Sequence, residues 1–170
     1  MQQSKRTSFT KLAIPTQDGR FIASYSEKGL AEMNFPSKEN AGANSTLKGV
    51  TAPVRRWHRM TTAALKRVLA GRATGVLPPL DLSGTDFQRR VWSALRQING
   101  GKTRGYGEIA KQIGKPKAVR AVGGACGANP IPVLIPCHRV LAANKKLGGF
   151  SGGLDWKRTL LAREGITPRG

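Results

Sequence analysis

The sequence predicts a small α/β domain over residues 1–79, followed by a mainly α-helical domain with a helix-turn-helix over residues 80–170. Three observations lead to this fold class. Two strand-like runs lie in the first part of the chain and are followed by an amphipathic helix pattern. The second part carries a series of helix patterns, most of them closed by glycine. Two of these helices are short and joined by a Gly-Lys-Pro turn, which is typical of a helix-turn-helix but also occurs in plain packed helix pairs.

The N-terminal strands are expected over residues 20–25 and 30–35, where apolar and aromatic residues gather. Gly29 between them can adopt the positive φ that a tight turn needs. Residues 36–53 are rich in Ser, Asn, Gly and Lys, so a loop is expected there. These signals together predict a small sheet in the N-terminal domain.

An amphipathic helix is expected over residues 54–70, because apolar side chains recur every three to four positions. Gly71 is the expected helix stop, and residues 72–79, which end in two prolines, are expected to form a linker.

Four further helices are expected in the C-terminal domain. Their ranges are 85–99, 106–113, 117–126 and 154–164. Thr85 can cap the first of them. Between the third and the fourth, prolines at 130, 132 and 136 exclude a helix, so residues 129–140 are expected to form a stiff, extended segment that delivers Cys137.

The charge of the chain points to a polyanionic partner. Lys and Arg number 29 against 9 Asp and Glu, which gives a net charge of +20. Nucleic acid is the commonest polyanion that a folded basic protein meets, although acidic membranes or ribosomes would select the same charge. No apolar run is long enough for a transmembrane helix, and no secretory signal is expected. Two cysteines are too few for a disulfide scaffold or a four-thiolate zinc site, so both thiols are expected to be free.

Cys137 is the strongest candidate for chemistry, because His138 and Arg139 follow it directly. A thiol becomes a strong nucleophile when a base or a positive charge favours its thiolate form. His138 can be that base if the chain turns at Cys137, and it then needs a carboxylate that fixes its tautomer. The C-terminal domain offers five acidic residues: Asp81, Asp86, Glu108, Asp155 and Glu164. Glu164 is conspicuous because an acid is disfavoured at the end of a helix.

The remaining thiol and imidazole carry less information. His58 follows Trp57 in a helix without a partner at metal-binding spacing, so a structural role is expected. Cys126 lies in a helix of small residues, where packing is the simpler interpretation. The two cysteines and two histidines have no recognised metal-site spacing, so no metal is expected.

Several motifs together resemble the O6-alkylguanine-DNA alkyltransferases, also called methylated-DNA–protein-cysteine methyltransferases. The similar segments, in the order of that family, are Gly84–Gln88, Val91-Trp92, Thr103–Ala110, Lys117–Gly123, Asn129-Pro130, Ile135–Val140 and Ser151–Gly153. The resemblance covers about residues 80–166, whereas residues 1–79 are similar only in outline. A sister group that binds without transfer has tryptophan in place of the acceptor cysteine, and this chain retains Cys137.

The resemblance implies a role for each residue of the catalytic set. Cys137 would accept the alkyl group, and His138, polarised by Glu164, would draw the thiol proton through a bridging water. Asn129 would brace the turn, and Tyr106 would donate to N3 of the departing guanine.

The resemblance also implies a DNA surface and a substrate pocket. Arg120 would enter the base stack as the damaged nucleotide is flipped out, with the recognition helix in the minor groove. The implied DNA contacts are Tyr106, Lys117, Arg120, Ala121, Gly123, Gly124 and Ala128, and the implied pocket residues are Val140, Leu147, Gly148, Ser151 and Gly152.

These implications define an enzyme of DNA repair. It would move an alkyl group irreversibly, once per protein, from O6-alkylguanine or O4-alkylthymine in double-stranded DNA to Cys137, with no cofactor. We expect a cytoplasmic monomer, nuclear in a eukaryotic cell, with cooperative binding to DNA left open. Two alternatives stay open: a DNA-binding sensor or transcription factor that does not transfer the group, and a cysteine hydrolase that uses Cys137 and His138.

Overall fold

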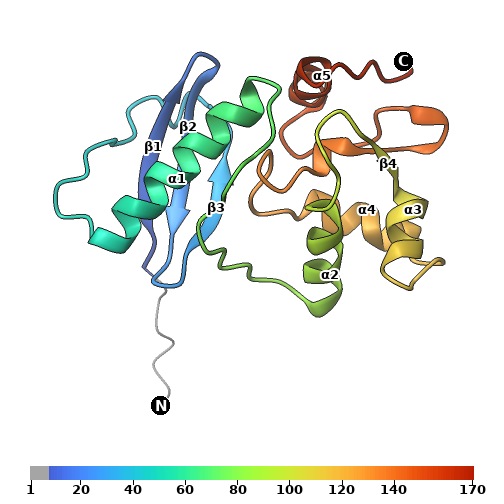
Figure 1. Ribbon diagram of the computed structural model, residues 1–170, viewed down its shortest axis with the longest axis horizontal. Helices are drawn as coiled ribbons and strands as arrows, with labels where there is room; N and C mark the ends of the chain where they lie inside the picture. Colours follow the sequence, from blue (N-terminus) through green and yellow to red (C-terminus); the bar gives the residue numbers. More distant parts are fainter. Residues whose placement is uncertain (1–7) are drawn as a thin grey trace. The chain divides into compact units, whose positions relative to one another are not determined.

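The structure, a computed structural model, describes residues 8–170 (Figure 1). It contains two compact units, one formed by the described residues up to Ala63 together with Val76–Leu82, the other by Ala64–Gly75 and Ser83–Gly170. The domain boundary between residues 79 and 80 stays a prediction. Within residues 8–170, no helix has the length and apolar character needed to cross a bilayer.

The first unit is built on a three-stranded antiparallel sheet. Its strands are β1 (Thr10–Thr16), β2 (Gly19–Tyr25) and β3 (Leu30–Asn34), in the order β1-β2-β3. β2 and β3 confirm the two predicted strands, whereas β1 was not predicted. Pro15 makes its sequence a poor strand signal, but a proline is tolerated in β1 because this strand lies at the edge of the sheet.

The turn between β2 and β3 requires glycine. Ser26 N–H donates to the Gly29 carbonyl at 2.9 Å, and Gly29 has a φ of +153°. A Cβ atom at Gly29 would lie 2.1 Å from the carbonyl oxygen of Pro79. The segment that was expected to be a linker therefore returns to the sheet, where Leu30 N–H donates to Pro79 O at 2.8 Å.

Helix α1 (Ala52–Leu69) confirms the predicted amphipathic helix (Figure 1). The side chains of its apolar stripe, Trp57, Leu65 and Val68 among them, are buried. His58 is also buried and hydrogen-bonds through Nδ1 to the Tyr25 hydroxyl at 3.0 Å, which fits the structural role expected of it.

The second unit begins with α2 (Asp86–Leu95), which starts at the predicted cap. Thr85 accepts from Gln88 N–H at 3.1 Å and Gln88 reaches back to Thr85 N–H, which completes a capping box. The helix ends four residues before the predicted end, because the chain continues in tighter turns in which Ile98 N–H donates to Leu95 O. Trp92 Nε1 donates to Ala125 O at 2.8 Å and ties α2 to the helix that contains Ala125.

Two short helices, α3 (Tyr106–Gln112) and α4 (Val119–Gly127), follow. Gly114, with a φ of +74°, ends the first, and α4 begins two residues later than predicted. Strand β4 (Arg104–Gly105) precedes α3 and pairs in parallel with β5 (Val140–Leu141).

The prediction of an extended segment over residues 129–140 is wrong. Ile135 N–H donates to Ile131 O at 2.9 Å, and Val133 between them has a φ of +74°. Cys137–Arg139 forms a 3₁₀ turn, η1. Prolines fix only their own φ and restrict the residue before them, so the non-proline positions were free to turn. The chain then passes through η2 (Ala143–Lys145) to the last helix, α5 (Leu154–Arg163).

Candidate active site

Cys137 is held at the start of η1 by Asn129. The thiol is buried, with 4% of the residue exposed. Asn129 Nδ2 donates to Cys137 Sγ at 3.1 Å and to Ile135 O at 2.8 Å, while Asn129 Oδ1 accepts from Ile131 N–H at 3.0 Å. One amide side chain therefore fixes both the turn and the sulfur.

Opposing effects act on the ionisation of this thiol. Burial raises the pKa of Cys137, because it disfavours the charged form. The hydrogen bond from Asn129, the positive charge of Lys157 and the N–H groups of Cys137 and His138 oppose that rise in pKa. Burial therefore keeps the resting thiol protonated, and the surrounding donors stabilise a thiolate once it forms.

His138 and Glu164 form a buried pair. His138 Nε2 lies 3.1 Å from Glu164 Oε1, and the two side chains are 0% and 2% exposed. Burial lowers the pKa of His138, against the influence of Glu164, so the imidazole is neutral. The carboxylate accepts a hydrogen bond from the protonated Nε2, which leaves Nδ1 as the basic nitrogen. Nδ1 is buried and has no hydrogen-bond partner among residues 8–170.

Arg139 holds the same carboxylate. Its Nε and a terminal nitrogen lie 3.0 Å and 2.6 Å from the two Glu164 oxygens, and its other terminal nitrogen donates to Ile98 O at 2.6 Å. Burial raises the pKa of Glu164, but its hydrogen bonds and electrostatic interactions with His138 and Arg139 outweigh that effect and lower the pKa to about 2. Arg139 was noted only as a neighbour of Cys137, and its hold on Glu164 is a finding of the structure.

Lys157 is a second charged residue that the sequence analysis missed. It is fully buried in α5, and its Nζ donates to Val140 O at 2.7 Å and to Gly149 O at 3.1 Å. Burial lowers the pKa of Lys157 to about 8, although the thiols of Cys137 and Cys126 favour its charged form. Helical spacing places Lys157 on one face with Leu160, Leu161 and Glu164, a signal that could have shown it to be buried.

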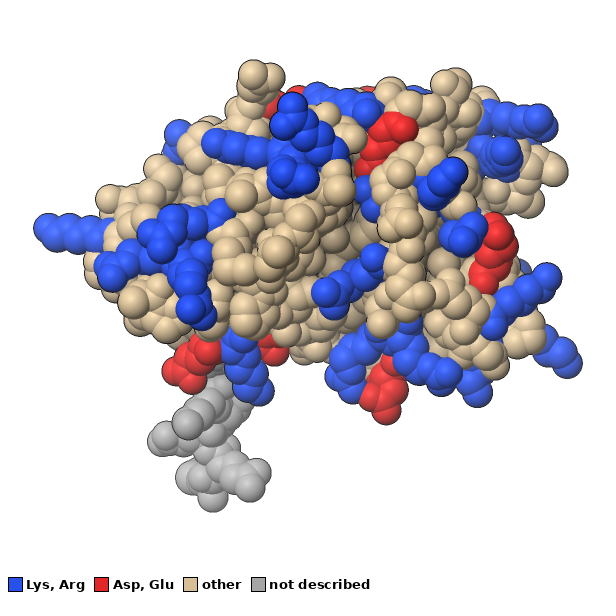
Figure 2. Space-filling view, in the orientation of Figure 1, with Lys and Arg blue, Asp and Glu red and all other residues tan. Residues whose placement is uncertain are grey.

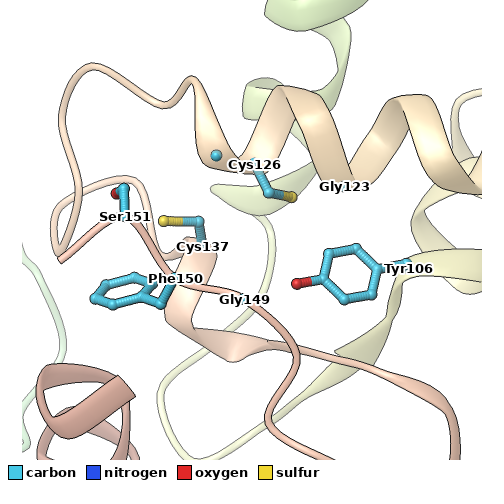
Figure 3. Close-up of a pocket in the computed structure, with 8 residues that line it drawn as sticks. Tyr106, Gly123, Cys126, Cys137, Gly149, Phe150 and Ser151 are labelled. Atoms are coloured by element: carbon cyan, nitrogen blue, oxygen red, sulfur yellow. The ribbon is translucent and has the colours of Figure 1, made fainter. Parts of the chain in front are cut away.

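The thiol opens onto a cavity of about 390 Å³ (Figure 3). Its lining residues are Tyr106, Gly123, Cys126, Gly127, Cys137, Gly149, Phe150 and Ser151. The Tyr106 hydroxyl points toward the centre of the cavity from one side, and Phe150 and Ser151 lie on the other. Burial, followed by the two nearby thiols, raises the pKa of Tyr106 to about 12, so its hydroxyl stays a proton donor.

The other residues predicted for the pocket are not among those that line this cavity, and their role stays a prediction. Leu147 packs against Leu141 and Leu161 in a small apolar cluster. Val140 is buried and contributes its carbonyl to Lys157. Gly148 lies beside Tyr106, where an added Cβ would be 3.1 Å from the hydroxyl, and Gly152 does not line the cavity.

Most of the residues predicted to contact DNA lie on α4 or directly beside it, whereas Tyr106 begins α3. Those on α4 and its flanks that face solvent are Lys117, Arg120, Ala121, Gly124 and Ala128. Gly123 and Tyr106 instead border the cavity that contains Cys137.

Cys126 lines the cavity together with Cys137, although packing was the expected role. Gly123, Cys126 and Gly127 follow helical spacing i, i+3 and i+4, which places them on one face of α4. Burial, and then the nearby Cys137, raises the pKa of Cys126 to about 12, so this second thiol is a poor nucleophile.

Residues 86–166 match the family model described as "6-O-methylguanine DNA methyltransferase, DNA binding domain". The chain is 60% identical over 95 residues to a methylated-DNA–protein-cysteine methyltransferase of Mycolicibacterium paratuberculosis, a match that covers 56% of this chain and 58% of that protein. It is 50% identical over 107 residues to the protein of the same name from Methanosarcina acetivorans, covering 63% of this chain and 69% of that one. The matches thus span about three-fifths of the mycobacterial relatives, 58% of the first and 61% of the Mycobacterium bovis protein.

Solved structures extend the similarity to most of the chain. The crystal structure of Mycobacterium tuberculosis OGT in complex with DNA superposes with a TM-score of 0.72 at 39% identity, covering 91% of both chains. That of M. tuberculosis O6-methylguanine methyltransferase has a TM-score of 0.72 at 36% identity, with 96% of this chain and 97% of that one covered.

Proposed function

Because the chain belongs to the O6-alkylguanine-DNA alkyltransferase family, we propose that it repairs DNA by moving an alkyl group from O6-alkylguanine, and from O4-alkylthymine, to Cys137. The observation that carries this proposal is the buried Cys137 thiol at the wall of a cavity, hydrogen-bonded by Asn129 and adjacent to the His138–Glu164 pair. A soft sulfur nucleophile suits attack on an alkyl carbon, and the cavity falls in the size range of small-molecule sites.

The proton of the thiol passes through a bridging water to Nδ1 of His138. This route is supported by the hydrogen bond of Nε2 to Glu164, which leaves Nδ1 unprotonated and without another described partner. Glu164, fixed by Arg139, stabilises the imidazolium that forms. Asn129 stabilises the thiolate in the meantime.

In the transfer itself the bond between Cys137 Sγ and the alkyl carbon forms as the carbon–O6 bond breaks. The electron pair of the broken bond stays on guanine, which leaves poorly as an anion. Tyr106 at N3 and Ser151 at O6 donate hydrogen bonds to that developing charge, a role supported by their positions on the cavity wall. The guanine regains a proton in place of the one that the thiol lost.

DNA is bound through α3 and α4 as a helix-turn-helix, with α4 in the minor groove. The small exposed residues Ala121, Gly124 and Ala128 allow close approach of the backbone, and Lys117 meets phosphate. Arg120 fills the gap that the flipped base leaves, which offsets a cost of a few kcal/mol. The substrate places the protein in the cytoplasm, or in the nucleus of a eukaryotic cell, and it acts as a monomer without a cofactor.

None of the described residues that line the cavity can cleave a thioether, so each protein acts once. The full chain incubated with excess duplex containing O6-methylguanine should therefore gain one methyl mass per protein, and Cys137→Ser should gain none. Trypsin leaves Cys126 and Cys137 in one peptide, between Arg120 and Arg139, so fragment ions between the two cysteines must locate the methyl group.

Two results would overturn this function. Repeated turnover without an adduct would point to a cysteine hydrolase. Tight binding of the methylated duplex by the folded chain, with both thiols unmodified, would point to a sensor of damaged DNA.

A further inference from the structure

The first half of α1 presents three arginines to solvent. Arg55, Arg56 and Arg59 are all exposed, and all belong to the first compact unit. Figure 2 shows Lys and Arg side chains gathered over this end of the helix. Arg55 and Arg59 lie one turn apart, about 6 Å along the axis, and Arg56 lies beside them.

This arginine cluster (Arg55, Arg56 and Arg59) has no partner within the part of the chain that the structure describes. None of the three guanidinium groups makes an ion pair or a hydrogen bond among residues 8–170. α1 contains no acidic residue at all, whereas α2, α3 and α5 each contain one.

The placement works against the stability of the helix. Like charges at i and i+4, as at Arg55 and Arg59, repel each other by a few tenths of a kcal/mol. The N-terminal end of a helix also favours acids, yet the first turn of α1 has none and arginines follow directly. A bound anion would relieve both effects.

We propose that the arginine cluster of α1 binds the phosphate backbone of duplex DNA, as a contact separate from α4. Three guanidinium groups within one helical turn match the regular phosphates of a strand, which carries one charge per about 3.4 Å of duplex axis. Among residues 8–170 the exposed large hydrophobic side chains are Phe9, Val76, Val119 and Leu154, and none of them belongs to α1, so charge dominates the recognition by the cluster. This inference goes beyond the proposed function, because it gives the N-terminal unit a sequence-independent role in binding.

The test compares two full-length triple variants with the same net charge. The first is Arg55→Gln/Arg56→Gln/Arg59→Gln. The matched control is Lys11→Gln/Lys28→Gln/Lys38→Gln, which removes three exposed lysines of the same unit. Affinity for an unmodified duplex several helical turns long is measured over a range of salt concentrations.

The slope of log affinity against log salt should become shallower by up to about 2.7 in the arginine variant, since each released phosphate contact contributes about 0.9. The lysine variant should retain the slope of the parent chain. Equal losses in the two variants would assign the effect to net charge and overturn the proposal, and so would an unchanged slope in both.

Two further readouts separate the possible failures. Unfolding by urea should show the arginine variant to be at least as stable as the parent, because the removed charges repel one another; a marked loss of stability would instead make the cluster structural. Methyl transfer by the parent chain is measured independently. If no adduct forms but the salt dependence still differs between the two variants as expected, the proposed function is contradicted and this inference stands.

Discussion

Four ionisable side chains next to Cys137 are buried, and each is held by named partners. His138 and Arg139 both hydrogen-bond to Glu164, and Lys157 donates to two backbone carbonyls. Buried charge is costly unless it is paired and hydrogen-bonded, so this concentration is unusual for a structural core. It fits a site that must tolerate a transient thiolate.

Replacing Lys157 by methionine, which has a similar length, should slow alkylation of Cys137 about tenfold at neutral pH. Without the positive charge of Lys157, which lowers the pKa of the Cys137 thiol, that pKa rises further and the pH–rate profile moves to higher pH. The rate of methyl transfer as a function of pH measures this shift. Lys146→Met, at an exposed lysine of the same unit, serves as the control, and an unshifted profile for Lys157→Met would show that the lysine acts only in packing.

The sequence indicated the residues with reactive side chains, but it did not show that Arg139 and Lys157 are buried beside them. Cys137 and His138 are adjacent in a short motif, and Glu164 is misplaced for a helix end, so all three gave a local signal. Arg139 and Lys157 are of types that are usually solvated, and only their long-range contacts show that they are buried. Which carboxylate serves His138 was likewise open on the residues alone, and only the resemblance chose Glu164.

Helices and strands with strong local signals were predicted to within a few residues. α1, α2 and α5 have an apolar stripe, a capping residue or a glycine stop. Strand β1 was not predicted at all, and the turn before Cys137 was predicted to be extended because of its three prolines, although a proline restricts only its own φ and the residue before it. The edge position of β1 and the hydrogen bonds of the turn before Cys137 determine the conformation of these two segments.

Two glycines that end helices allow a controlled test of close packing. Gly71 and Gly114 have φ values of +72° and +74°, so alanine at either position costs about 1 kcal/mol in backbone strain. A Cβ at Gly71 would also lie 2.2 Å from Arg163 O, whereas none of the described atoms lies within 4 Å of one at Gly114. Gly71→Ala should therefore lower the free energy of unfolding by about 2 kcal/mol more than Gly114→Ala, as measured by urea denaturation. Equal losses of unfolding free energy in the two variants would mean that the backbone near Arg163 moves away from the added Cβ at little cost.

On the scale of the whole molecule, the high positive charge is the strongest indication of what the protein binds. A net charge of +20 on 170 residues was evident from composition alone, and it predicted a polyanionic partner before any motif was considered. Composition cannot say where that charge acts: the resemblance implied the helix that contains Arg120, and the proposed contact of the arginine cluster of α1 came only from the structure.

Two buried groups of lowered pKa, together with the high net positive charge, make the stability of the fold sensitive to acid. The pKa of His138 lies below its usual value and that of Glu164 is lowered from 4.5 to about 2, so the unfolded chain binds more protons than the folded one as the pH falls. Stability should decline below about pH 6.5 and lose about 3 kcal/mol more between about pH 4.5 and 2, because a shift of one pKa unit is worth about 1.4 kcal/mol. Neutralising the nine acidic side chains adds self-repulsion. Urea unfolding at a series of pH values measures the decline, and a flat profile down to about pH 3 would contradict the buried pairing of Glu164.

Glu164 follows the last helix, whereas its buried partners His138 and Arg139 come 26 and 25 residues earlier. During translation Cys137 and His138 are therefore synthesised before the carboxylate that pairs with His138. A chain that ended between positions 138 and 164 would contain the Cys137 thiol and His138 but lack the carboxylate that pairs with the imidazole. The His138–Glu164 pair beside Cys137 can therefore form only after the last helix has been synthesised.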